Sequence, residues 1–271
     1  VVGKGDQFVV CQERPPVSTE QLAALMVAAA SEHVAVLLLP ELHVRPAELS
    51  GLVGVGGAVL TVAGSFHVED GEVRNRAPVL VDAGHRLWAH DKRGYFRVQR
   101  REVEAKNGWF EPATGVSEEV CEGIVGGGCL TVLDTSLGRI AVVICADALD
   151  PDGYRRAIED ARPDLLLVVA MSTKTDDFEG RAAEWERLGI STLLVNVGPP
   201  SAVRGLCWGA IAGSAQHAPT RIRWLGEVVE GWRAGTTGWS QAVGGVAVLH
   251  PVLGLVVDLA AMVRDGKEVA Q

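Results

Sequence analysis

Short, wholly apolar runs alternate along the chain with longer segments that carry polar residues. The apolar runs are rich in β-branched residues and too short for helices, which is typical of strands buried on both faces. Strands are predicted over residues 8–11, 34–39, 58–62, 77–82, 86–90, 130–134, 139–145, 165–170, 191–197, 246–249 and 253–259. Helices are predicted over residues 18–32, 154–161 and 178–188, the first with Glu20 in its first turn.

This order of elements predicts the fold class. Helices that alternate with buried strands and with hairpins imply mixed sheets covered by helices, so we expect an α/β (α+β) protein with two packed sheets. We predict a single domain over residues 1–271. Residues 93–119 are charged and irregular, which predicts a long surface loop. Residues 201–244 show no clear period and are a candidate insertion in the domain.

Charge and composition limit the classes of molecule that the protein is expected to bind. The net charge is −9 and the chain has no Lys/Arg-rich run, which argues against nucleic acid or an anionic membrane as the main partner. No apolar run reaches the length of about 18 residues that a membrane span needs, and no secretory signal is visible. The five cysteines are scattered without a Cys-x-x-Cys pair, which fits reduced thiols. We therefore expect a cytoplasmic protein that acts on small molecules.

Three predicted strands end in ionisable residues of complementary types: Glu41, Lys92 and Cys145. The carboxylate can take the thiol proton, the thiolate can attack a carbonyl or nitrile carbon, and the ammonium can stabilise negative charge on oxygen. Each residue alone also has a plain structural explanation, as a packed thiol or a solvated charge. A Cys-His protease with Cys145 and His43 is an alternative, but it leaves Glu41 and Lys92 unexplained.

The segments around these three residues resemble those of the nitrilase, or carbon-nitrogen hydrolase, superfamily. The apolar strand followed by Pro40-Glu41 is similar to the family's glutamate motif, and residues 138–147 with Pro151 are similar to its nucleophile motif. The segment from Asn75 to Lys92 is similar to the one that carries the family's lysine. Residues 193–198 and 245–259 resemble two later elements of the family.

The resemblance implies a four-layer α-β-β-α sandwich that forms a homo-oligomer, a dimer or higher. It also implies hydrolysis through a thioester on Cys145, with Glu41 as general acid and base. Lys92 and the backbone N–H of Ala146 would hold the oxyanion, and Asn196 is a candidate for substrate binding. The resemblance implies neither a metal nor an organic cofactor.

Two features refine this expectation. Asp147, two residues after the cysteine, is similar to amidase-type members, so an amide or ureido bond is favoured over a nitrile. Many members have a second glutamate, for which Glu104 is our candidate. Its rivals are Glu102, Glu111 and Asn107. Nitrile hydrolysis, acyl transfer to an amine, and a catalytically silent binding or assembly module stay open as alternatives.

Overall fold

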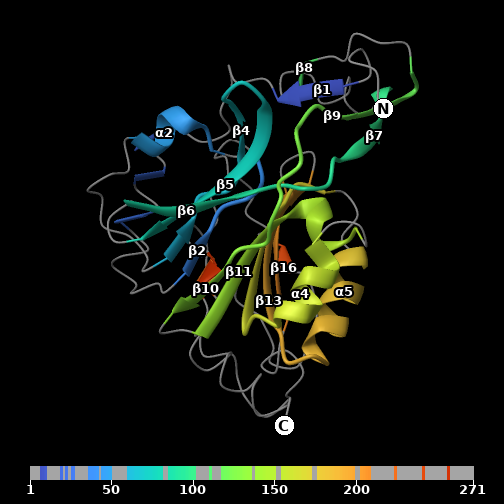
Figure 1. The fold of residues 1–271 in the computed structure, drawn as a ribbon. Coiled ribbons are helices and arrows are strands. Elements are labelled where there is room, and N and C mark those ends of the chain that lie inside the picture. The colour runs from blue at the N-terminus through green and yellow to red at the C-terminus, as the bar shows by residue number, and fades with distance from the viewer. Residues whose placement is uncertain are drawn as a thin grey trace.

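The computed structural model describes seventeen segments of the chain. They are residues 7–10, 19–20, 22–23, 26–27, 36–42, 44–50, 60–81, 85–101, 110–111, 117–135, 138–150, 154–172, 176–198, 202–208, 223–224, 240–241 and 255–256. Figure 1 shows how the two largest sheets and the helices are arranged.

The larger sheet has six strands in the order β10-β11-β12-β13-β14-β16. Their bounds are Val132–Thr135, Gly138–Ile144, Leu165–Ala170, Ser191–Gly198, Ala202–Trp208 and Ser240–Gln241. The central strands β11, β12 and β13 are parallel, whereas β10 and β14 pair antiparallel at either side. The parallel strands are continuous runs of Val, Leu and Ile because helices on one side and the second sheet on the other exclude water from both faces.

The second sheet has five strands, in which β5 pairs with β3, β4 and β6 and β2 lies beside β3. The bounds are β2 Val36–Leu38, β3 Leu60–Val62, β4 Phe66–Glu69, β5 Val73–Val81 and β6 His85–Asp91. A turn at Asp70-Gly71 joins β4 to β5, with φ of 72° at Gly71. Parallel pairing of β2 with β3 and antiparallel pairing elsewhere make this a mixed sheet.

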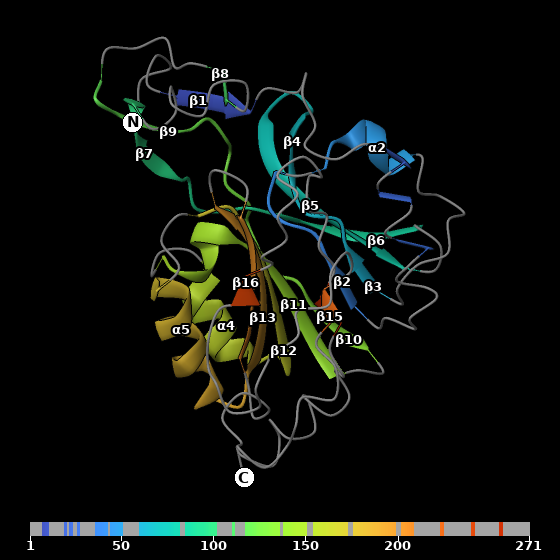
Figure 2. The same cartoon turned by 180° about the vertical axis from the view of Figure 1, so that it is seen from behind.

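One hydrophobic core joins the two sheets. Buried side chains of β2, β3 and β5 form a single cluster with those of β11, β12 and β13 and with Phe178 and Trp185 of α5. The helices α4 (Arg156–Ala161) and α5 (Asp176–Glu186) lie on one side of the six-stranded sheet and the five-stranded sheet lies on the other. Figure 2 shows the same order from behind. The predicted α/β class with two packed sheets is confirmed.

The region predicted to be one long loop contains strands. β7 (Arg97–Gln99), β9 (Glu119–Glu122), β1 (Gln7–Val10) and β8 (Phe110–Glu111) form a four-stranded sheet in that order. The loop prediction was therefore wrong for residues 97–99, 110–111 and 119. β7 and β8 are short and each carries a charged residue, so they lack the apolar run that marks a buried strand.

The remaining elements are small. They are α2 (Pro46–Ser50), the 3-10 turn η2 (Cys145–Ala148), β15 (Arg223–Trp224) and β17 (Leu255–Val256). β14 and β16 belong to the candidate insertion at residues 201–244 and lie in the larger sheet. Apart from residues 223–224, the rest of this insertion lies outside the described segments. The predicted strand 246–249 lies outside them as well. The division into domains stays a prediction.

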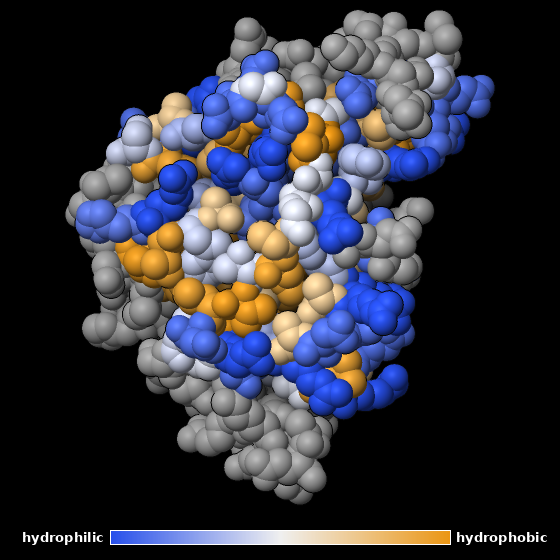
Figure 3. All heavy atoms as spheres, in the orientation of Figure 1, coloured by the Kyte–Doolittle hydropathy of each residue, from blue (hydrophilic) through white to orange (hydrophobic). Residues whose placement is uncertain are grey.

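The surface is mixed in character. Figure 3 shows hydrophobic residues gathered in a band across the middle of one face, between hydrophilic areas. In the segments described above, the exposed large hydrophobic residues are Val27, Leu87, Tyr95 and Val125. No helix in those segments is both long enough and apolar enough to cross a membrane.

Candidate active site

The site lies where strand ends of the two large sheets meet. Glu41 follows β2, Lys92 follows β6 and Cys145 follows β11, as the sequence predicts. All three side chains are almost completely buried, with exposed fractions of 2%, 1% and 3%. Lys92 Nζ donates to Glu41 Oε1 at 2.8 Å, and the Cys145 thiol forms a hydrogen bond with the Glu41 carboxyl group. The structure therefore brings the three predicted residues together.

The backbone at Cys145 is strained. Cys145 has φ of 46°, in the left-handed region that a residue with a side chain rarely adopts. Such a conformation costs on the order of 1–3 kcal/mol and is found mainly where function requires it. Here it turns the chain sharply from β11 into η2. Ala146 is the second residue of η2, and the role of its N–H at an oxyanion stays a prediction.

Lys92 is held in place by hydrogen bonds of its backbone as well as by those of its ammonium group. Its N–H donates to the Asn75 carbonyl oxygen at 2.8 Å, and its carbonyl oxygen accepts from the Gly127 N–H at 2.8 Å. A Cβ on Gly127 would collide with the Asp91 carbonyl oxygen. The run Gly126-Gly127-Gly128 thus lets two backbone segments touch beside the lysine.

A second carboxylate contacts Lys92, and it belongs to Glu122 of β9. Glu122 Oε2 accepts from Lys92 Nζ at 2.7 Å, so the ammonium lies between two buried carboxyl groups. Sequence reasoning missed Glu122. Burial does not alternate clearly along β9, because Cys121 is buried as well as Val120 and Glu122, so no local pattern marks the inward glutamate. Glu104, our candidate, lies outside the described residues.

Two polar side chains complete this cluster. Asn75 Nδ2, from β5, donates to Glu122 Oε1 at 2.7 Å and to Glu41 Oε1 at 3.1 Å. His67 Nε2, from β4, lies 3.0 Å from Glu122 Oε1. The Met171 N–H, at the end of β12, donates to Glu41 Oε2 at 2.9 Å. Each carboxyl oxygen of the cluster is therefore fixed by at least one donor.

The two carboxyl groups differ in their affinity for a proton. Burial raises the pKa of Glu41, and the Glu122 anion raises it further, while Lys92 acts in the opposite direction. Burial also works to raise the pKa of Glu122, but Lys92 and His67 together hold this pKa far below its usual range. Diverging pKa values in a pair of carboxyl groups separate a permanent anion from a group that exchanges protons. The lowered pKa of Glu122 fits the permanent anion, and the raised pKa of Glu41 makes it the candidate for proton exchange.

The pKa values of the Cys145 thiol and the Lys92 ammonium group are shifted as well. Burial and the neighbouring Glu41 carboxylate raise the pKa of Cys145, so its side chain is at rest a protonated thiol. Burial works to lower the pKa of Lys92, but Glu122 and Glu41 outweigh it and raise this pKa well above its usual value. The arrangement can thus keep Lys92 positive while Glu41 accepts the thiol proton during an attack.

Asp147 binds the backbone of the turn that follows Lys92. Its completely buried carboxylate accepts from the Gly94 N–H at 2.7 Å and from the Arg93 N–H at 3.0 Å. His90 Nε2 lies 3.4 Å from the same carboxylate. Asp147 therefore joins η2, which carries Cys145, to the turn that follows Lys92.

Asn196 lies near the site but bonds to the protein backbone. Its Oδ1 accepts from the Ser172 N–H at 2.7 Å, and its Nδ2 donates to the Ser172 carbonyl oxygen at 2.9 Å. These bonds hold the residue that follows Met171, whose N–H binds Glu41. Contact of Asn196 with a substrate stays a prediction.

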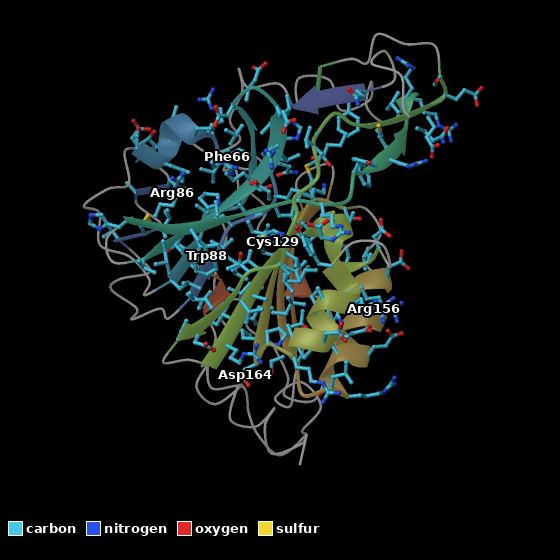
Figure 4. All side chains as sticks on the ribbon, viewed as in Figure 1. Phe66, Arg86, Trp88, Cys129, Arg156 and Asp164 are labelled. Carbon is cyan, nitrogen blue, oxygen red and sulfur yellow. The ribbon has the colours of Figure 1, made fainter. Side chains whose placement is uncertain are left out.

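A separate surface cavity of about 530 Å³ lies beside α4. Its wall includes Arg93, Tyr154 and the exposed Cys129, but none of the three predicted catalytic residues. Cys129 is labelled in Figure 4. Within the described segments, no group of His, Cys, Asp and Glu side chains is arranged to hold a metal ion.

Several solved structures share this arrangement of strands and helices. The structure matches a cysteine-to-alanine variant of the amidase of Nesterenkonia AN1, from the nitrilase superfamily, with a TM-score of 0.56 and 16% identity over 98% of this chain and 95% of that one. A second structure of an amidase from Nesterenkonia sp. gives a TM-score of 0.52 with 17% identity, over 76% of this chain and 84% of that one.

A third match is the glutamine-dependent NAD⁺ synthetase of Acinetobacter baumannii, with a TM-score of 0.52 and 20% identity over 74% of this chain and 40% of that one. No protein-family model and no curated protein sequence matches the chain. The protein has the fold of the nitrilase superfamily, which confirms the resemblance of its motifs at the level of the fold.

Proposed function

We propose that the protein is a thiol hydrolase that cleaves a non-peptide carbon-nitrogen bond, amide or ureido, of a small molecule. The observation that carries this proposal is the buried contact of Lys92 with both Glu41 and Glu122 beside the Cys145 thiol. A buried ion cluster is costly to desolvate and is weak evidence for stability by itself. Its position at a strained cysteine favours a catalytic role.

The first chemical step forms a thioester through a tetrahedral intermediate. As Cys145 Sγ attacks the carbonyl carbon, Glu41 takes the thiol proton and the carbonyl π electrons move to oxygen. The raised pKa of Glu41 suits this transfer, because a stronger base takes a proton more readily from a thiol whose own pKa is raised. Lys92 and the Ala146 N–H stabilise the oxyanion.

The remaining steps release the two products. The intermediate collapses, the carbon-nitrogen bond breaks, and Glu41 gives its proton to the leaving nitrogen, which departs as ammonia or an amine. Glu41 then takes a proton from water as the water oxygen attacks the thioester carbon. Collapse of this second intermediate releases the acid, and the proton returns to the Cys145 sulfur. Substrate and water are the only reactants that this sequence needs.

Similarity to nitrilase-superfamily amidases supports an amide over a nitrile, as does the amidase-like Asp147. Nitrile hydrolysis and acyl transfer to an amine use the same three residues and are the alternatives. A catalytically silent binding or assembly module is the alternative from another class. We keep a homo-oligomer and a cytoplasmic location as further parts of the proposal.

Release of ammonia tests the function. Purified protein would be incubated with small aliphatic amides, with ureido compounds and with matching nitriles, and ammonia would be followed by a coupled assay. We expect release from amides or ureido compounds by the wild type and none by Cys145→Ala. Ammonia release equal in the two proteins for every compound would contradict the proposal and favour the silent module.

A further inference from the structure

His67 is a buried residue with an ionisable ring beside the second carboxylate. It lies on β4 and is 5% exposed, and the register of the sheet pairs it with Asn75 of β5. Both side chains therefore lie on the same face, and both contact Glu122 Oε1. Arg74 and Arg76 flank Asn75 and lie on the opposite face, where both bind Asp91.

Three donors and the His67 ring surround the Glu122 carboxylate, two groups at each oxygen. Oε1 receives bonds from His67 at 3.0 Å and from Asn75 at 2.7 Å. Oε2 accepts from Lys92 Nζ at 2.7 Å and from the Phe96 N–H at 3.3 Å. A carboxylate has about four acceptor positions, so a proton could reach Glu122 only by replacing one of these donors.

Glu41 has a different set of partners. Lys92 and Asn75 donate to Oε1, and the Met171 N–H donates to Oε2. Its further hydrogen bond is with the Cys145 thiol, which carries the proton that catalysis must move. The two carboxyl groups share Lys92 and Asn75, and each also accepts from one backbone N–H. They differ in their remaining side-chain partner, which is His67 for Glu122 and Cys145 for Glu41.

We propose that His67 is a positioning residue, whose Nε2–H fixes Glu122 as the ionised partner of Lys92 and so leaves Glu41 as the carboxyl group that exchanges a proton with Cys145. This inference rests on the proposed function. It assigns the proton to Nε2 of His67, because a carboxylate oxygen can only accept. Within the described part of the chain, the charged groups linked to His67, directly or through Glu122 and Lys92, are Glu122, Lys92 and Glu41. Glu69, the next residue on the same face of β4, is exposed.

Loss of the His67 donor has a defined consequence for pH dependence. Glu41 and Glu122 titrate as a coupled pair, and removal of a donor from one raises the pKa values of the pair. Activity that requires both groups ionised is lost as pH falls through these values. The acid limb of the pH profile should therefore move to higher pH, by about one unit for a hydrogen bond to a buried charge.

The test compares His67→Leu, which removes the donor, with His67→Gln, which keeps an N–H donor. The rate of alkylation by iodoacetamide would be followed on the peptide that contains Cys145, across pH, so that the exposed Cys129 does not contribute. His85→Leu is the matched control, since His85 is exposed at the start of β6. The pH dependence of kcat/KM would be measured on any substrate that the ammonia assay finds.

We expect an acid limb about one unit higher in His67→Leu, partial or full recovery in His67→Gln, and no change in His85→Leu. A folded His67→Leu protein whose acid limb equals that of the wild type would overturn the proposal. If His67→Leu does not fold, nitrogen NMR of the wild-type histidine rings decides. A proton on Nε2 of His67 throughout the active pH range supports the proposal, and a deprotonated Nε2 overturns it.

The alkylation profile separates this inference from the proposed function. If no amide, ureido compound or nitrile is hydrolysed but the acid limb of Cys145 alkylation still moves in His67→Leu, the proposed function fails and the role of His67 stands. If hydrolysis is found and the limb does not move, the role of His67 fails alone.

Discussion

The backbone N–H of Met171 donates a hydrogen bond of 2.9 Å to Glu41 Oε2, across 130 positions of sequence. Glu41 follows a strand of the five-stranded sheet and Met171 follows a strand of the six-stranded sheet. This bond joins the two sheets at the site and orients one oxygen of the carboxyl group that contacts Cys145. Packing of the sheets and placement of the proposed base are therefore linked.

Glu41→Gln should remove most of the turnover. The amide cannot take the thiol proton, and general acid-base catalysis typically contributes about 10² to 10⁴ in rate. We expect kcat to fall by a factor in this range, while circular dichroism stays that of the wild type. Glu119→Gln, at an exposed carboxylate of β9, is the control and should keep full activity. Equal kcat in Glu41→Gln and wild type would exclude Glu41 as the base.

Gly127→Ala should damage both stability and activity. The new Cβ would collide with the Asp91 carbonyl oxygen and push the backbone that holds Lys92. We expect a loss of about 2 kcal/mol or more in the free energy of unfolding, as for other strained core substitutions. In Gly128→Ala, the neighbouring control, the Cβ meets no atom within 4 Å. Thermal denaturation of the two variants should differ clearly, and equal melting temperatures would contradict this account.

Asp147→Ala should loosen the turn after Lys92. It leaves the N–H groups of Arg93 and Gly94 without their carboxylate acceptor in a partly buried place. Buried donors without partners cost about 1–3 kcal/mol, more where a charge was involved. Urea denaturation should show this loss, and Asp134→Ala, at an exposed carboxylate, should stay within about 0.5 kcal/mol of the wild type. A stable Asp147→Ala protein with a full-rate active site would show that Asp147 is dispensable.

Glu122 should stabilise the fold at neutral pH but not in acid. Its folded-state pKa lies below the usual value of 4.5, so the unfolded chain binds the proton more tightly. The stabilisation is therefore present above about pH 4.5 and is lost as pH falls below it. The difference in unfolding free energy between wild type and Glu122→Gln should shrink from about pH 7 to about pH 3. A difference that stays constant over this range would argue against a strongly ionised Glu122.

Much of the fold was predictable because the buried strands are continuous apolar runs. The predicted strand 165–170 coincides with β12, and the predicted hairpin of residues 130–134 and 139–145 matches the pairing of β10 with β11. The strands that were not predicted, such as β7, are short and carry exposed charges. Their pairing depends on neighbours distant in sequence, which local patterns do not encode.

The site was predictable to the extent that its residues stand at the ends of such strands. Glu41, Lys92 and Cys145 do so and were found. Glu122 and His67 lie within short strands in which polar and apolar residues are mixed. From sequence alone, a polar residue in such a strand is expected to face solvent. Only the pairing of β4 with β5 and the arrival of β9 beside Lys92 show that both point inward.

Trapping of a covalent intermediate on Cys145 tests the central claim most directly. Wild type and Cys145→Ser would be mixed with an amide that releases ammonia, quenched in acid, and analysed by intact mass and peptide mapping. We predict a mass gain equal to the acyl group on the Cys145 peptide of the wild type, which disappears on addition of hydroxylamine as a hydroxamate forms. Ammonia release without any adduct on Cys145, or turnover by Cys145→Ser at the wild-type rate, would contradict the thioester mechanism.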